Sequence, residues 1–178
     1  MSYIIPKDEC TLSEQRAFKE AAMQAGILRA VDKIGGAADE YVAREIAPIA
    51  EAGAAGDWWA TAVLTVAGNA YSCFQAIASP TLAANKMAVF YGVAITTAPV
   101  PVSRLRFRHA GIAGNVLAVF DLDRIANGNT VEGYFSQPVP WDPNQQITVE
   151  VVASIATGAL CRVVLWNWLI EPVGPTIG

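Results

Sequence analysis

From residue 57 onward, the chain consists of short β-rich runs separated by turn residues rather than by helices. Eight runs are predicted to be strands, at residues 60–66, 71–78, 86–95, 102–108, 115–121, 133–136, 147–155 and 160–170. Alternation is clearest in the seventh run, where Ile147, Val149 and Val151 share one face and Thr148 and Glu150 share the other. Strands joined by turns indicate an antiparallel β-sandwich or barrel, and eight strands favour the jelly roll.

Residues before this region have helical spacing. Thr11 followed by Glu14 is the signature of a capping box, in which each side chain satisfies a free backbone N–H of the other residue. A helix is therefore predicted to begin there and to end at Gly35-Gly36. A second helix is predicted from about Ala37 into the forties.

The first helix is expected to bury one apolar stripe, made of Phe18, Ala21, Ala25 and Leu28 with Ala17 and Ala22 beside it. We therefore expect a mostly β protein in two parts. Residues 1–56 form an N-terminal helical arm, and residues 57–178 form the antiparallel β-sandwich, or jelly roll, domain.

The last predicted strand is apolar on both faces. One face holds Val164, Trp166, Trp168 and Ile170, and the other holds Val163, Leu165 and Leu169. A strand of a two-layer sandwich normally has one polar face. This strand is therefore either covered by the helical arm or placed at a subunit interface, and Trp166 and Trp168 are candidate interface residues.

Composition supports subunit contacts. Hydrophobic residues make up 53% of the chain and charged residues only 16%, against about a quarter charged in typical globular domains. The most apolar stretch, Val163–Ile170, is too short to span a membrane, and acidic residues near the N-terminus argue against a signal peptide. We expect a homo-oligomer, a trimer; the alternative is a well-packed monomer rich in Ala and Gly.

The first residues form a short apolar tail, Tyr3-Ile4-Ile5-Pro6. It precedes the predicted helix and belongs to no periodic element. Such a tail is either disordered or docked on a neighbour. Tyr3, Ile4 and Ile5 are therefore candidate interface residues.

Arg104, Arg106 and Arg108 occupy alternate positions of one predicted strand and so project from the same face. Three guanidinium groups in a row favour an anionic partner, and Arg binds carboxylates in a bidentate fork. The row is a candidate protein interface; a solvated strand face is the alternative. Direct nucleic-acid binding is not expected, because the net charge is −4.

Residues for catalysis are sparse, and no catalytic, cofactor or metal site is predicted. His109 is the only histidine, and no phosphate-binding loop is present. Asp121 and Asp123 lie two apart, but this spacing is weak evidence for a paired-carboxylate site. The three cysteines include no Cys-x-x-Cys motif and are expected to be reduced thiols in a protein assembled in the cytoplasm.

Aromatic residues offer an alternative function. Trp141 lies among Pro138, Pro140 and Pro143, which are predicted to mark a loop. Aromatic loop residues bind sugars or anchor interfaces. A carbohydrate- or receptor-binding module that uses Trp141 and Tyr134 as a stacking platform is therefore a second hypothesis, and an enzyme that uses Asp121 and Asp123 is a third.

Four segments, 86–93, 117–124, 133–139 and 168–174, resemble the jelly-roll structural proteins of tailed bacteriophages, above all capsid cement or decoration proteins. The resemblance covers residues from about 57 to 178. It implies a non-catalytic virion subunit on the capsid surface, assembled in the host cytoplasm, that binds the phage major capsid protein and itself. The long helical arm departs from this pattern and leaves a tail or baseplate role open.

Overall fold

The computed structural model of the chain describes residues 2–46, 60–63, 75–77, 81–95, 102–109, 115–122, 131–153 and 160–174. Its elements are, in chain order, β1 (Ile4–Pro6), η1 (Lys7–Glu9), α1 (Leu12–Lys33), η2 (Ala38–Glu40), β2 (Tyr41–Ile46), β3 (Ala60–Val63), β4 (Gln75–Ile77), β5 (Met87–Ile95), β6 (Val102–His109), β7 (Val116–Asp121), β8 (Val131–Trp141), β9 (Ile147–Ala153) and β10 (Leu160–Pro172).

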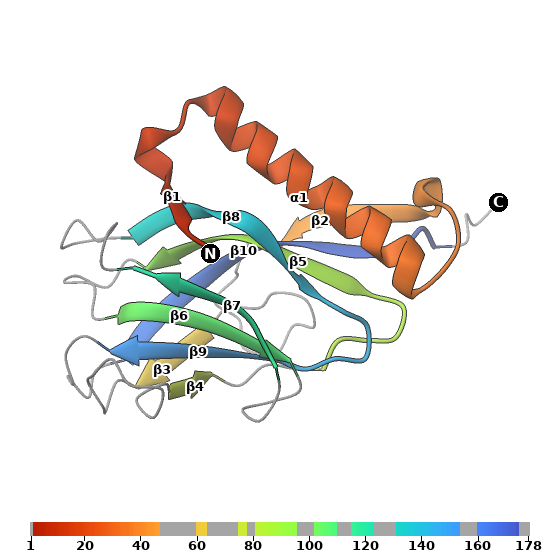
Figure 1. The fold of residues 1–178 in the computed structure, drawn as a ribbon. Coiled ribbons are helices and arrows are strands. Elements are labelled where there is room, and N and C mark those ends of the chain that lie inside the picture. Colours follow the sequence, from red (N-terminus) through yellow and green to blue (C-terminus); the bar gives the residue numbers. More distant parts are fainter. Residues whose placement is uncertain are drawn as a thin grey trace.

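Strands β3 to β10 pair in a nested order. The pairs β3·β10, β4·β9, β5·β8 and β6·β7 are all antiparallel. They form two sheets, with the order β3-β10-β5-β8 in one and β4-β9-β6-β7 in the other. This is one long antiparallel ribbon rolled into two layers (Figure 1), which is the jelly roll. The predicted fold class is confirmed.

The core lies between the two sheets. Val149 and Val151 of β9 point into it, together with Leu105 and Phe107 of β6 and Leu165 of β10, and all five are fully buried. These residues alternate with side chains that point the other way, as the period of two requires. The predicted inward face of β9 is therefore confirmed.

Residues 3–46 wrap the larger sheet from edge to edge, and we call them the N-terminal strap. Strand β1 adds to β8 at one edge, and β2 pairs with β10 at the other. Between them, α1 lies across the outer face of the sheet (Figure 1). Both added strands cover backbone groups that an open edge would leave exposed.

Strand β2 shows that the prediction of a second helix after Ala37 is wrong. Residues 41–46 pair with β10 over six positions, from Tyr41 opposite Pro172 to Ile46 opposite Asn167. Tyr41 and Ala43 pack under α1, whereas Val42 between them is 47% exposed. Pairing with β10 and burial of one face therefore make residues 41–46 a strand, although their apolar residues also have helical spacing.

The start and end of α1 are as predicted. The Thr11 Oγ1 accepts a hydrogen bond from the Glu14 N–H at 3.3 Å, and the Thr11 N–H donates to Glu14 Oε2 at 2.8 Å. Gly35 and Gly36 follow the helix with φ of 105° and 81°, values that glycine adopts without steric cost.

The helix docks mainly through small residues, and of the predicted stripe only Phe18 and Ala22 face the sheet. Its buried positions are Ala22, Gly26 and Ala30, and Leu28 is 67% exposed. A Cβ on Gly26 would lie 2.2 Å from Ile170 Cδ1 and 2.7 Å from Val89 Cγ2. The helix backbone therefore touches the sheet at Gly26, and the prediction that Ala21, Ala25 and Leu28 are buried is wrong.

Strand β10 is covered on both faces. Leu165 and Leu169 lie in the core between the sheets, and Trp166, Trp168 and Ile170 pack beneath α1. Of the two explanations for its apolar faces, cover by the N-terminal segment is the one that the structure supports.

The predicted loop at Pro138 and Pro140 is wrong, because both residues belong to β8. Here β8 pairs with β5 alone, since β1 reaches only residues 133–135. Proline is tolerated in an edge strand, where its missing N–H faces no partner strand. The predicted domain boundary at residue 56 lies outside the described residues and stays a prediction.

Replacing Gly26 tests the contact between α1 and the sheet. We expect Gly26→Leu to lower the free energy of unfolding by about 1–3 kcal/mol through overpacking against Ile170 and Val89, measured by urea denaturation. Ala25→Leu, on the exposed side of the same helix, is the control and should cost less than about 0.5 kcal/mol. Equal effects at the two positions would show that the close approach is absent.

Candidate functional site

A cavity of about 380 Å³ lies between the N-terminal part of the strap and the outer face of the larger sheet. We call it the helix–sheet pocket. Its lining comes from six elements: Lys7, Gln15, Lys19, Glu45, Tyr91, Tyr134 and Trp166. The volume falls within the range of about 300–1,000 Å³ that is usual for small-molecule sites.

The position of the pocket follows from the slope of α1. Gly26 holds the second half of the helix against the strands, and the N-terminal end rises away from them (Figure 1). Phe18 fills part of the widening gap and stacks on Tyr134, with ring centroids 5.3 Å apart. The rest of the gap is bordered by polar side-chain ends.

One side of the pocket is an ionic group centred on Glu45 of β2. Its Oε1 accepts hydrogen bonds from Lys19 Nζ, at 2.8 Å, and from the Tyr91 hydroxyl. Burial raises the pKa of Glu45, but the bonds from Lys19 and Tyr91 outweigh it, so the pKa lies below its ordinary value. Burial and the bond to Glu45 raise the pKa of Tyr91. At neutral pH the group is a carboxylate with two donors.

The floor of the pocket carries a neutral hydrogen-bond chain. The Tyr134 hydroxyl donates to Gln15 Oε1 at 3.2 Å, and Gln15 Nε2 donates to the Cys10 carbonyl at 3.1 Å. Burial raises the pKa of Tyr134, so its hydroxyl stays protonated. The Gln15 amide is thus fixed in one orientation at the start of α1.

Trp166 forms the remaining wall. A Cβ on Gly92 would lie 2.4 Å from its Cε3 atom, so the indole lies directly against the backbone of β5. The Lys7 Nζ lies 5.7 Å from the ring centroid and 2.9 Å from Glu132 Oε2. The ring is therefore held in place by the Gly92 backbone against it and by the paired Lys7 ammonium group over it.

The candidate interface residues at the N-terminus belong to the edge of the sheet. Ile4 is buried and pairs with Phe135, and Ile5 pairs with Tyr134. Tyr3 is 60% exposed, and its N–H donates to Ser136 Oγ at 3.0 Å. The tail is thus neither disordered nor docked on a neighbour, as was expected, but paired with β8 of this chain, and its role in an interface stays a prediction.

The arginine row of β6 faces a carboxylate of the same chain. Arg106 and Arg108 both donate from Nε to Glu150 Oε2, at 3.0 Å from Arg108. Arg106 is 2% exposed and Glu150 1% exposed, so the row is not a solvated face at its centre. Arg104 lies opposite Asp121 of β7. A role of the row in binding another chain stays a prediction.

The aromatic candidates have separate places. Trp168 packs under α1, and its Nε1–H donates to the Lys19 carbonyl at 2.9 Å. Trp141 is 4% exposed, and its ring stacks on Phe90 in the core with centroids 5.9 Å apart. A stacking platform on Trp141 is therefore wrong, whereas Tyr134 does line the pocket.

The residues considered for catalysis are not gathered at the pocket. His109 ends β6, and its N–H donates to the Asn115 carbonyl at 3.0 Å. Asp121 is exposed at the end of β7, and Asp123 lies outside the described residues. Within the described ranges, no three His, Cys, Asp or Glu side chains gather as metal ligands. No helix in these ranges has the length and apolar character to cross a membrane.

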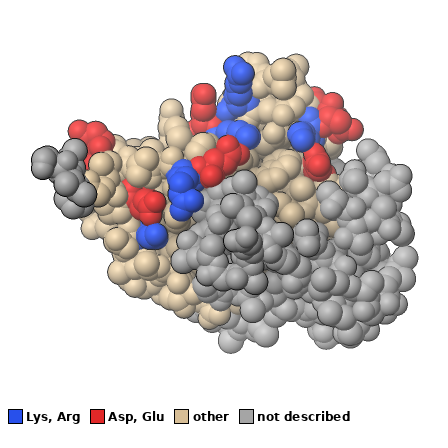
Figure 2. Space-filling view, turned by 180° about the vertical axis from the view of Figure 1, so that it is seen from behind, with Lys and Arg blue, Asp and Glu red and all other residues tan. Residues whose placement is uncertain are grey.

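Charged side chains on the surface are interspersed. Figure 2 shows one face of the molecule, on which the described acidic and basic residues lie next to one another. Among the described residues, Lys86 lies 3.0 Å from Glu171 and Lys19 lies 2.8 Å from Glu45. Paired charges of opposite sign largely cancel, so the described residues of this face build no extended field of one sign.

Comparisons with known proteins do not define a family. No protein-family model and no curated protein matches the chain. A structure of infectious bursal disease virus, Gt strain, matches over 78% of this chain and 33% of its own, with 13% identity and a TM-score of 0.34. The chain thus spans a third of the length of that protein.

Two further structures are similar at the same identity. The C-terminal CBM6 of LamC, a marine laminarinase from Zobellia galactanivorans, matches over 54% of this chain and 72% of its own, with 13% identity and a TM-score of 0.28. The insecticidal delta-endotoxin Cry8Ea1 from Bacillus thuringiensis matches over 58% and 19%, with 13% identity and a TM-score of 0.27. No role of these proteins is transferred to this chain at such scores.

Replacing Glu150 tests the buried ion pair. We expect Glu150→Gln to lower the free energy of unfolding by about 3–5 kcal/mol, because the buried Arg106 charge loses its carboxylate. Glu132→Gln removes the exposed pair with Lys7 and should cost less than about 1 kcal/mol. Chemical denaturation of both variants measures the difference, and a loss at Glu150 no larger than that at Glu132 would contradict the assignment.

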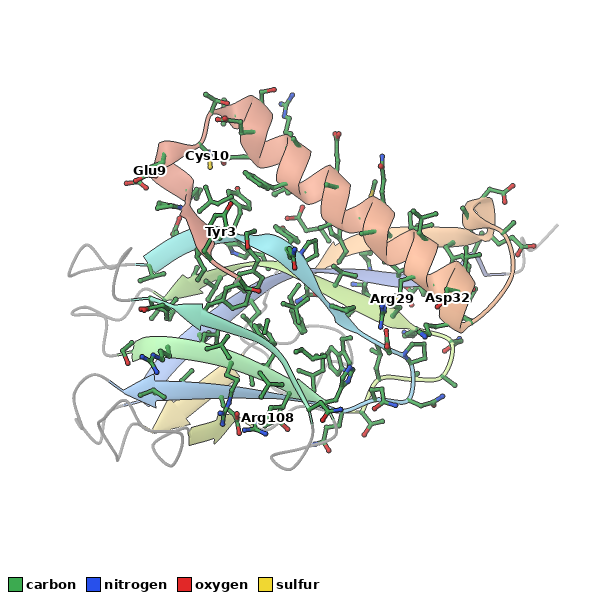
Figure 3. The ribbon with its side chains drawn as sticks, viewed as in Figure 1. Tyr3, Glu9, Cys10, Arg29, Asp32 and Arg108 are labelled. Atoms are coloured by element: carbon green, nitrogen blue, oxygen red, sulfur yellow. The ribbon has the colours of Figure 1, made fainter. Side chains whose placement is uncertain are left out.

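A second ion pair fastens the far end of α1. Arg29 reaches from the helix toward the strands (Figure 3), and its Nε and Nη2 donate to the two carboxylate oxygens of Asp142 at 2.6 and 2.8 Å. The hydrogen bonds from Arg29 hold the pKa of Asp142 below its ordinary value. The folded state therefore binds this proton more weakly than the unfolded state does.

The Arg29–Asp142 pair is expected to make the free energy of unfolding depend on pH. Its contribution is complete above the unfolded pKa of about 3.9 and is lost as the pH falls through the lower folded value. We expect Asp142→Asn to cost about 1 kcal/mol at pH 7, and the difference from wild type to shrink below about pH 4. Asp32→Asn, at a carboxylate that is 71% exposed, is the control. Denaturation curves measure the free energy of unfolding of wild type and of Asp142→Asn at each pH. If the difference between the two stays constant from neutral to acid pH, the assignment is refuted.

Proposed function

We propose that the chain is a non-catalytic structural subunit of a virion, of the capsid cement or decoration type found in tailed bacteriophages. In this role it assembles with copies of itself, as a trimer, and binds major capsid subunits on the capsid surface. The sequence resemblance suggested this role, and the jelly roll is compatible with it. Fold alone does not determine function, so the proposal needs an observation at the surface.

The observation that carries the proposal is the placement of exposed apolar side chains. The described residues expose six large hydrophobic side chains, and four of them lie on the N-terminal strap: Tyr3, Leu12, Leu28 and Val42. Leu12 is 76% exposed and Leu28 67% exposed. A partner that covers such side chains gains about 25 cal/mol per Å² of apolar surface.

The strap also holds these side chains in a fixed position relative to the sandwich. It is joined to both edges of the sheet by β1 and β2 and across the face by the Arg29–Asp142 pair. A partner bound to the outer side of α1 would thereby be connected to the sheet at three places. Strand β10 does not enter this argument, because its two faces are covered within the chain.

A binding experiment with particles assembled without this chain tests the proposal. We expect the full chain to bind them, and the double variant Leu12→Ser with Leu28→Ser to bind at least about tenfold more weakly, a loss of about 1.4 kcal/mol. Val116→Thr, at a 41% exposed residue of the smaller sheet, is the matched control. All variants should keep their stability within about 0.5 kcal/mol, since the positions are exposed. Sedimentation with the particles measures binding.

Light scattering of the free chain adds an independent test. A trimer is the expected mass, and a monomer at micromolar concentration would contradict self-assembly in solution. Absence of binding to the particles, with folded protein, would refute the cement role. Binding to tails or baseplates instead would place the subunit elsewhere in the virion and would equally overturn the capsid assignment.

A further inference from the structure

The helix–sheet pocket is not used by the proposed structural role, and its lining is unusual for a helix packed on a sheet. Such an interface is normally filled with apolar side chains. Here the pocket is lined by polar residues instead. They carry two ammonium groups (Lys7 and Lys19), a carboxylate (Glu45), an amide (Gln15) and two phenol hydroxyls (Tyr91 and Tyr134). Hydrogen-bond donors and acceptors therefore both line the helix–sheet pocket.

These groups are held in place before any ligand arrives. Glu45 is fixed by Lys19 and Tyr91, and the Gln15 amide by Tyr134 and the Cys10 carbonyl. Ligand binding would not need to order these side chains, which reduces the entropy cost of association. A pocket with fixed groups selects ligands by the positions of their own donors and acceptors.

The charges in and beside the pocket are balanced. Lys7 lies 2.9 Å from Glu132, and Lys19 lies 2.8 Å from Glu45. An anion would have to compete with a carboxylate for either ammonium group, and a cation would have to compete with an ammonium group for either carboxylate. The electrostatics therefore favour a neutral ligand that carries many hydrogen-bonding groups.

The wall formed by Trp166 adds apolar surface to the pocket. Its indole lies against the Gly92 backbone, and the Lys7 Nζ lies over the ring, 5.7 Å from its centroid. A neutral ligand that carries both hydroxyl and C–H groups matches the polar groups and the apolar surface of the lining. Saccharides have this combination, because their hydroxyls both donate and accept and their ring faces are apolar.

We propose that the helix–sheet pocket binds a neutral saccharide unit, with C–H groups next to the indole of Trp166 and its hydroxyls bonded to Gln15, Glu45 and the two tyrosine hydroxyls. The proposal does not depend on the virion role. The two are tested separately, since one is read on the isolated chain and the other on particles.

Titration of the full chain with glucose, galactose, mannose, N-acetylglucosamine, rhamnose and maltose tests the proposal. The tryptophan indole N–H signals are followed by NMR at sugar concentrations up to about 50 mM, which detects affinities weaker than millimolar. Trp166→Phe identifies the Trp166 signal. We expect at least one sugar to shift this signal saturably and to leave the Trp141 signal, which lies in the core, unchanged.

Variants locate the site. Gln15→Ala should weaken the binding by about tenfold, and Tyr134→Phe, which removes only a hydroxyl, should weaken it as well. Gln24→Ala, at an exposed glutamine of the same helix, is the matched control and should leave the affinity unchanged. If Tyr134→Phe does not fold, the comparison of Gln15→Ala with Gln24→Ala still decides the outcome.

Three results would overturn the proposal. The first is that no sugar of the panel shifts the Trp166 signal. The second is that a sugar binds with equal affinity to wild type and to Gln15→Ala. The third is that acetate, sulfate or phosphate shifts the Trp166 signal whereas the sugars do not, because the pocket would then be an anion site.

Discussion

The docking of α1 on the outer face of the larger sheet is the contact on which the other features depend. That face presents Tyr91, Trp166, Trp168 and Ile170, a surface that cannot be left in water without a large loss of hydrophobic stabilisation. Gly26 lets the helix backbone reach Ile170, and the strap pairs with part of each sheet edge through β1 and β2. The N-terminal strap thus covers the outer face of the sheet and pairs with its edges. The helix–sheet pocket lies where the N-terminal end of α1 leaves the sheet.

Much of the β architecture could be predicted from local pattern. The run 147–155 alternates, and β9 follows that alternation; the run 86–95 is almost identical to β5. The apolar character of both faces of β10 correctly indicated that something covers it. Strand β2 could not be predicted in the same way, because residues 38, 42, 46 and 49 have helical spacing as well. Its pairing with β10 is a contact across more than a hundred residues, which local pattern does not contain.

The sites were less predictable than the strands. Alternate spacing placed the arginines of β6 on one face, but only the register between β6 and β9 sets Arg106 opposite Glu150. The prolines that flank Trp141 predict a loop, whereas β8 accepts Pro138 and Pro140 along a stretch paired on one side only. The pocket draws Lys7, Lys19 and Glu45 from separate parts of the strap. Two of its lining residues, Tyr134 and Trp166, are named from the sequence, but as a stacking residue beside Trp141 and as a subunit-interface residue.

Lys19 connects the pocket to the stability of the strap. Its carbonyl accepts the Trp168 indole N–H, and its ammonium group binds Glu45, so one residue of α1 is bonded to β10 and β2. A ligand that bridges Gln15 of the helix and Tyr91 of the sheet would add to the same set of contacts. Anything that binds the folded state alone stabilises it by mass action. Occupancy of the pocket would therefore tighten the strap on the sheet and hold the exposed side chains of α1, Leu12 and Leu28, in a fixed position for a partner.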